Sequence, residues 1–209
     1  GEFMLHVEKV EIHTRQSLNE KEKTLRVLAK RYKVTSYDGF DVGNADPTKP
    51  IVTDESFKKL INSKKDNALF DLGIKLYNLE IWDKATLVFK ECLNQNVKPD
   101  TSAYKLGNAL INLNRIEEGI ASLENATVYN PKYTSAFFNI GATCYDIHQY
   151  EKSVKYYQLA NNLKPNDDRI LYGIAASQYG LQQFDKSLEN CKKALVVNKD
   201  NENAKQLLQ

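Results

Sequence analysis

The sequence is poor in the residues that mark catalysis, metal binding or a membrane span. Its 209 residues include three cysteines and three histidines, and no run approaches the roughly 18–20 apolar residues that a membrane-spanning helix needs. Cys92, Cys144 and Cys191 form no C-x-x-C pair and lack the Cys and His spacing of a zinc site. We interpret them as small apolar core residues, and we predict no metal, no cofactor and no direct membrane insertion.

The charges are nearly balanced, which argues against a nucleic-acid partner. Lysine and arginine number 29 and the acidic residues 27, so the net charge is only +2. A nucleic-acid-binding chain is expected to concentrate basic residues on one face. The sequence also has no G-x-G-x-x-G loop and no pairing of a nucleophile with a base. These absences predict a protein that is not an enzyme.

Residues 1–65 precede the repetitive part of the chain. Gly1, Glu2 and Phe3 resemble residues left by an expression vector before Met4. Nothing after Met4 resembles a signal peptide, so we expect a cytoplasmic location. We predict a helical extension over residues 4–65, in which a capping box at residues 17–20 opens a helix over 18–33. A loop rich in Gly, Pro and Asp covers 35–52, and a short helix follows over 53–64.

The remainder repeats with a period of 34 residues. Small residues recur in this register at Gly73, Gly107, Gly141 and Ala175. Nine residues after each comes an aromatic or large apolar residue: Trp82, Ile116, Tyr150 and Phe184. This register predicts four copies of one unit, at residues 66–99, 100–133, 134–167 and 168–201.

The repeated unit resembles the tetratricopeptide repeat, a helix–turn–helix of about 34 residues. Its first-helix pattern reads, for example, Phe137, Ile140, Gly141 and Cys144, and its second-helix pattern reads Ser153, Tyr157 and Ala160. The resemblance implies an all-α fold, a right-handed α-solenoid of four tandem helical hairpins with an N-terminal helical extension. Residues 202–209 are then either a capping helix or the start of a truncated fifth repeat.

The first helix of each repeat is apolar on a second face as well. Residues spaced i, i+4 and i+7 share one face of a helix. In this chain they are Phe70, Ile74, Tyr77; Tyr104, Asn108, Ile111; Phe138, Ala142, Tyr145; and Tyr172, Ala176, Tyr179. In the family the first helices line the concave surface, so the resemblance implies a peptide-binding groove there. Packing between neighbouring first helices explains the same pattern, and both interpretations stay open.

Some family members hold the C-terminal carboxylate of a chaperone with a clamp of lysine, asparagine and arginine residues. Asn108, Asn139 and Arg169 fall on clamp positions. Two other clamp positions hold Tyr104 and Gly173 in place of cations. The clamp is therefore not expected, although Asn139 and Arg169 remain candidate peptide-binding residues.

These observations predict a non-catalytic interaction module, a scaffold or adaptor that binds a peptide segment of a partner protein in its groove. One alternative is a self-assembling scaffold whose N-terminal segment fills its own groove or that of a neighbour, which would give a homo-oligomer. Another is a secretion-type chaperone that shields an exported client.

Overall fold

The computed structural model describes residues 59, 61–63 and 66–208. Within these residues the regular elements are helices: α4 (Asp66–Asn78), α5 (Trp82–Asn94), α6 (Pro99–Asn112), α7 (Ile116–Tyr129), α8 (Thr134–Asp146), α9 (Tyr150–Leu163), α10 (Asp168–Gly180), α11 (Phe184–Val197) and α12 (Glu202–Leu207). The predicted helix over 18–33 and the loop over 35–52 lie outside the described residues. Of the predicted helix over 53–64, Lys59, Ile61 and Asn62 are described and are helical.

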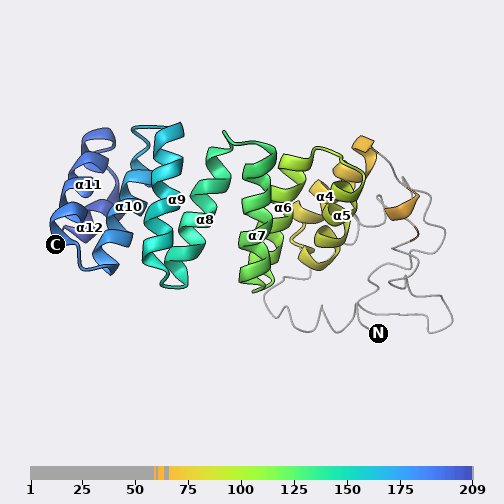
Figure 1. Cartoon of the computed structure of the whole chain (residues 1–209), viewed down its shortest axis with the longest axis horizontal. Coiled ribbons are helices and arrows are strands. Elements are labelled where there is room, and N and C mark those ends of the chain that lie inside the picture. Colours follow the sequence, from red (N-terminus) through yellow and green to blue (C-terminus); the bar gives the residue numbers. More distant parts are fainter. Residues whose placement is uncertain (1–58, 60, 64–65, 209) are drawn as a thin grey trace, which may run out of the picture. The chain divides into compact units, whose positions relative to one another are not determined.

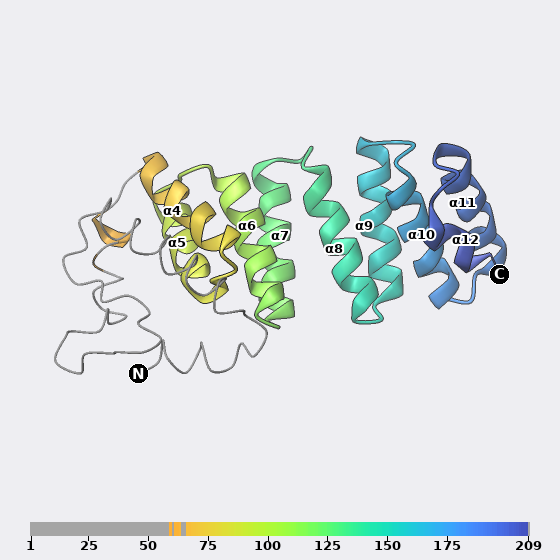
Figure 2. The same ribbon diagram turned by 180° about the vertical axis from the view of Figure 1, so that it is seen from behind.

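The chain divides into two units between Leu69 and Phe70, and the account below concerns the second unit. From α5 to α12 each helix contacts the next, and Phe70 and Tyr77 of α4 pack on Phe89 of α5 (Figures 1 and 2). They form four consecutive hairpins, α4–α5, α6–α7, α8–α9 and α10–α11, followed by the short helix α12. The all-α solenoid of four tandem hairpins predicted from the sequence is therefore confirmed.

The core of each hairpin consists of the residues that the repeat pattern assigns to it. In the first helices these are Leu72, Leu106, Ile140 and Ile174, all buried. In the second helices the buried set is Ala85, Phe89, Cys92; Gly119, Leu123, Ala126; Ser153, Tyr157, Ala160; and Ser187, Cys191, Ala194. Large and small residues therefore face each other across every hairpin, which lets the helices approach closely.

The small residues of the first helices are required by the rings that pack on them. A Cβ atom placed on Gly73 would lie 2.8 Å from the Phe89 ring, and one on Gly141 would lie 2.9 Å from Tyr157. Tyr157 also packs on the next hairpin, because a Cβ atom on Gly173 would lie 2.5 Å from its Cζ. The Tyr157 ring is therefore held between two glycines and joins α8–α9 to α10.

The turn inside each hairpin has the same geometry in all four copies. One residue per turn adopts a left-handed conformation, with φ near 60°: Glu80, Asn114, His148 and Gln182. The amide of the next residue then donates to a carbonyl five residues earlier, as from Gln149 N to Cys144 O at 2.8 Å. This is a Schellman motif, which satisfies carbonyls at the end of the first helix and sets the angle of the second.

Helix α12 begins at a side-chain cap and packs on the last hairpin. The Asn201 carboxamide oxygen accepts from the Ala204 amide at 3.0 Å. Ala204 is buried with Leu171 and Ala194. Both interpretations of residues 202–209, a capping helix and the start of a fifth repeat, remain predictions.

Candidate interaction surface

The candidate surface is the second apolar face of α4, α6, α8 and α10, which the sequence pattern marks. We call Phe70, Tyr104, Phe138 and Tyr172 its first row, and Tyr77, Ile111, Tyr145 and Tyr179 its second row. Ile74, Asn108, Ala142 and Ala176 lie between the two rows along each helix. The two rows differ in how far their side chains are covered.

The first row is largely packed against neighbouring aromatic rings. Phe70 meets the edge of Phe89, and Phe138 meets the edge of Tyr157 with ring centroids 5.4 Å apart. Tyr104 lies against Tyr133 at 4.8 Å. Phe70 is only 7% exposed, whereas Tyr104, Phe138 and Tyr172 are half-buried. The packing interpretation therefore accounts for Phe70, and the other three keep part of their surface accessible.

The second row becomes more exposed along the chain. Tyr77 meets the edge of Trp82, the first residue of α5, with centroids 4.9 Å apart. Tyr145 and Tyr179 make the corresponding contacts with the first residues of α9 and α11 at 5.7 and 5.4 Å. Yet Tyr145 is 36% exposed and Tyr179 51%, whereas Tyr77 and Ile111 are half-buried. The accessible aromatic area of this row therefore lies on α8 and α10.

The positions between the rows are mostly small or covered. Ala176 is only 4% exposed, while Ile74 and Ala142 are half-buried. Burial raises the pKa of the Tyr77 hydroxyl, as does the nearby Tyr104, and hydrogen bonding with the Asn108 side chain partly offsets the rise. Phe70 and Ala176 have little surface to offer a ligand, so a binding surface would consist of the other predicted residues.

A carboxamide network fixes the polar part of this face. Asn139 Nδ2 donates to Asn108 Oδ1 at 2.8 Å and to the Tyr104 hydroxyl at 3.1 Å. The network ties α8 to α6, because Asn139 belongs to α8, whereas Tyr104 and Asn108 belong to α6. The two asparagines that match clamp positions are thus brought together by the fold.

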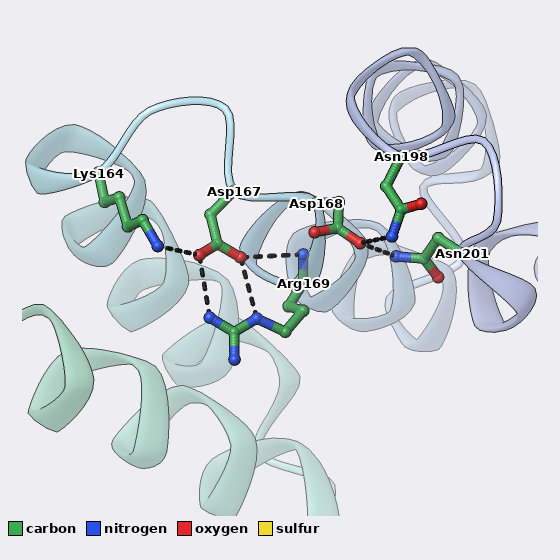
Figure 3. Close-up of polar contacts among 6 residues, drawn as sticks. All are labelled: Lys164, Asp167, Asp168, Arg169, Asn198 and Asn201. Carbon is green, nitrogen blue, oxygen red and sulfur yellow. Dashed lines mark hydrogen bonds and ion pairs between the residues drawn. The ribbon is translucent and has the colours of Figure 1, made fainter.

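Arg169 is held in place by a buried carboxylate, Asp167 (Figure 3). Its Nε and Nη2 atoms donate to the two oxygens of Asp167 at 3.2 and 3.1 Å, and Lys164 Nζ donates to Oδ2 at 2.8 Å. The guanidinium also lies 5.7 Å from the centre of the Phe138 ring. Burial would raise the pKa of Asp167, but the hydrogen bonds from Arg169 and Lys164 outweigh it and hold that pKa well below its usual range.

Asp167 was not among the residues singled out in the sequence. It is the N-cap of α10, where its Oδ1 accepts from the Arg169 amide at 3.1 Å. An Asp before an apolar helical run is a recognised helix-start signal, so the cap was detectable. The adjacent Asp168 points the other way and accepts from Asn198 and Asn201, each at 2.9 Å (Figure 3). One carboxylate thus fixes Arg169, and the other ties α10 to the loop before α12.

Two lysines that the sequence reading did not include also lie over aromatic residues of this surface. Lys98 Nζ is 4.4 Å from the centre of the Phe70 ring, and Lys105 Nζ is 4.2 Å from that of Tyr77. An amphipathic pattern does not select such residues, because their long side chains have polar ends and apolar stems. Their positions become visible only once α4 and α6 are placed side by side.

The cysteines and the acidic residues of the described part of the chain were also compared with the requirements of a metal site. The three cysteines are buried, and burial raises the pKa of the Cys92 thiol to about 11. Among the described residues no group of His, Cys, Asp and Glu is arranged to hold a metal ion. None of the described helices has the length and apolarity to span a membrane.

Comparison with known families gives a direct match for the middle of the chain. The family model for the tetratricopeptide repeat matches residues 101–133 and 134–167, which cover α6 from its third residue and all of α7, α8 and α9. The chain contains tetratricopeptide repeats over residues 101–167. A search among curated proteins gave no match.

Solved tetratricopeptide repeat structures share the fold at low sequence identity. MamA from residue 41 onward of Desulfovibrio magneticus RS-1 is 20% identical, with a TM-score of 0.63 over 68% of this chain and 80% of that chain. A second MamA crystal structure is 21% identical, with a TM-score of 0.63 over 71% and 88%. YrrB, described as a TPR protein with an unusual peptide-binding site, is 16% identical, with a TM-score of 0.64 over 98% and 96%.

Proposed function

We propose that this repeat protein is a protein-interaction module whose first-helix face binds a segment of a partner protein. The observation that carries the proposal is the exposure of Tyr145 and Tyr179 on neighbouring first helices. Half-buried Tyr104, Phe138 and Tyr172 extend the same face. Contiguous accessible aromatic surface is typical of protein-binding sites, and tyrosine offers both apolar area and a hydroxyl.

The two exposed tyrosines are already supported by neighbouring rings. Tyr145 leans on Tyr150, and Tyr179 on Phe184. A side chain that is restrained before binding loses less conformational entropy when a ligand arrives. Each tyrosine can therefore contribute contact area at low entropic cost.

The carboxamide network supplies the polar part of the proposed site. The two hydrogen atoms of Asn139 Nδ2 are used by Asn108 and Tyr104. Its Oδ1 accepts no hydrogen bond from the residues that the structure describes, so it is free to accept one from a backbone amide of the bound segment. Such an acceptor would set the register of an extended peptide, while the tyrosines would contribute most of the buried area.

A displayed library of short peptides tests the proposal. Peptides are selected on the folded full chain, and their affinities are measured by fluorescence anisotropy. The double variant Tyr145→Ser, Tyr179→Ser should bind the selected peptides about ten-fold or more weakly, because truncating a central aromatic contact typically costs more than about 1 kcal/mol. Helical circular dichroism should be unchanged, since both side chains are substantially exposed.

The control uses exposed apolar residues on second helices. Val128 of α7 and Val196 of α11 are both exposed, so Val128→Ser, Val196→Ser removes apolar surface away from the first-helix face. This control should leave peptide affinity unchanged. Equal loss in both double variants, or no loss in either, would contradict the proposed site.

The alternatives of self-assembly and client shielding stay predictions. The first depends on residues 4–52, which lie outside the described part of the chain. Light scattering of the same preparations tests self-assembly, which would raise the measured mass in the absence of any peptide.

A further inference from the structure

We infer that the partner segment is acidic at one end and pairs there with Lys98 and Lys105, at the α4–α6 end of the face. This inference rests on the proposed function and names the chemistry of its ligand. It follows from where the two ammonium groups are placed, from their lack of a carboxylate, and from their spacing.

Both lysines are positioned by rings on α4. Lys98 Nζ lies over Phe70 and Lys105 Nζ over Tyr77. A cation over the face of an aromatic ring is attracted by the ring's negative quadrupole, which restrains the side chain without neutralising its charge. The two ammonium groups are therefore pre-positioned on the same face as the tyrosines, where an anionic ligand can reach them.

Neither lysine forms an ion pair within the described part of the chain. Some other cations there have carboxylate partners: Arg169 pairs with Asp167, and Lys193 pairs with Glu189 at 2.6 Å. Burial lowers the pKa of Lys105, and no nearby carboxylate compensates for this. A partly desolvated cation without a partner is costly, and an anion brought by a ligand recovers that cost.

The spacing of the two rings limits what can bind. Phe70 and Tyr77 are two turns apart on α4, a separation of about 10 Å. About three residues of extended chain or two turns of a helix span that distance. The ligand is therefore a segment with at least two acidic side chains at this end, and its apolar part reaches Tyr145 and Tyr179.

A protein segment fits this surface better than single-stranded nucleic acid does. Nucleic-acid platforms stack bases on open aromatic rings beside basic residues. Here the rings beside the basic residues are already covered, because Phe70 is buried and Lys105 lies over Tyr77. Bases could not stack on them, whereas carboxylates can approach the ammonium groups from solvent.

Charge reversal tests the inference with the peptides selected on the wild-type chain. These peptides should carry clustered Asp or Glu residues. Lys98→Glu, Lys105→Glu should weaken their binding about ten-fold or more and reduce its dependence on NaCl, because two charge pairs become repulsive. Peptides whose acidic residues are replaced by lysine should regain affinity for this variant but not for the wild type.

The control is Lys132→Glu, Lys192→Glu, which changes the net charge equally at two other exposed lysines. It should alter affinity by less than about two-fold, since exposed charges beyond a Debye length are screened. The milder variant Lys105→Gln, with circular dichroism, separates loss of binding from loss of folding. Neutral selected peptides, or equal weakening by the two reversals, would overturn the inference.

The outcomes separate this inference from the proposed function. If peptide affinity falls in Tyr145→Ser, Tyr179→Ser but not in the double lysine reversal, the proposed function stands and the acidic-segment inference is overturned. Failure of the library to yield any binding peptide contradicts both. A single-stranded oligonucleotide that displaces the peptides, and loses binding on the same lysine reversal, would overturn the choice of a protein ligand.

Discussion

The two halves of the first-helix face differ although their residues occupy the same repeat positions. Tyr77 and Tyr145 are two periods apart, yet Tyr77 is half-buried under Lys105 and Tyr145 is exposed. The residue of the later repeats that corresponds to Lys105 is Gly173, again two periods on. A glycine has no side chain to place over Tyr145. The more covered tyrosine is thus the one whose following repeat supplies a long side chain over its ring.

Hairpin packing explains why position 173 is a glycine. A Cβ atom there would lie 2.5 Å from Cζ of Tyr157, whose ring fills the space between α8 and α10. At the position equivalent to Tyr157, the first hairpin has Phe89, which packs on Gly73 and against Phe70 and Tyr77 of its own hairpin. A large core ring between two hairpins therefore leaves a tyrosine uncovered on the face. The comparison teaches that core packing and the candidate binding surface are coupled.

The largest effects are expected at the contact between Gly173 and Tyr157, and the first test gives the two equivalent positions 105 and 173 the same side chain. Gly173→Leu should lower the free energy of unfolding by about 3 kcal/mol, because the new side chain collides with the Tyr157 ring in a packed interface. Lys105→Leu should change it by less than about 1 kcal/mol, since its stem already lies along Tyr77. Urea denaturation followed by circular dichroism measures both.

A double variant checks the cause of that loss. Tyr157→Ala alone should also destabilise the chain, by about 3–5 kcal/mol, because it removes a buried ring. Tyr157→Ala combined with Gly173→Leu should be more stable than the sum of the single effects predicts, since the leucine fills the space left by the ring. Strict additivity would show that Gly173 and Tyr157 are not coupled.

The second expected effect compares the two ends of the second row. Tyr77→Ser should cost about 2 kcal/mol, because Tyr77 is half-buried against Trp82 and Phe89. Tyr179→Ser should cost less than about 1 kcal/mol, because half of that side chain is exposed and its ring contact is with Phe184, also exposed. Equal losses would mean that the exposed half of the row is as structural as the covered half.

The sequence predicted the hairpin core well because a period of 34 residues fixes which residues face each other. Gly141 opposite Tyr157 and Gly107 opposite Leu123 follow from the register. Exposure on the second face was not predictable in the same way. It depends on which side chain of the following repeat covers each ring, such as Lys105 over Tyr77, and on interactions of polar residues that no periodicity marks.

The backbone conformation of the turns was likewise only partly predictable from the sequence. The break near residues 146–149 was predicted, and α8 ends at Asp146 while α9 begins at Tyr150. The left-handed residue in that turn is His148, where glycine or asparagine would be the usual choice. The repeat therefore imposes its turn on residues with little intrinsic preference for it, which sequence alone does not reveal.

The cations of the two halves differ as well, and this difference predicts a dependence on pH. Lys98 and Lys105 lie over rings without a carboxylate, whereas Arg169 lies over Phe138 and is paired with Asp167. Asp167→Asn would leave Arg169 over the Phe138 ring without a carboxylate partner, as Lys98 and Lys105 are over theirs. Because Arg169 and Lys164 are both exposed, the loss at neutral pH should be modest, about 1 kcal/mol in the free energy of unfolding.

The sign of the pH dependence follows from the lowered pKa of Asp167 in the folded chain. Its stabilising contribution is complete above its unfolded value of about 3.9, and it is lost as the pH falls from there towards the lowered folded pKa. The difference in stability between wild type and Asp167→Asn should therefore be constant from neutral pH to about pH 5 and shrink below about pH 4. Asp185→Asn, at an exposed position, serves as the control and should show no such change. A wild-type advantage that persists undiminished in acid would mean that Asp167 acts only as a neutral helix cap, and that Arg169 is not held by its charge.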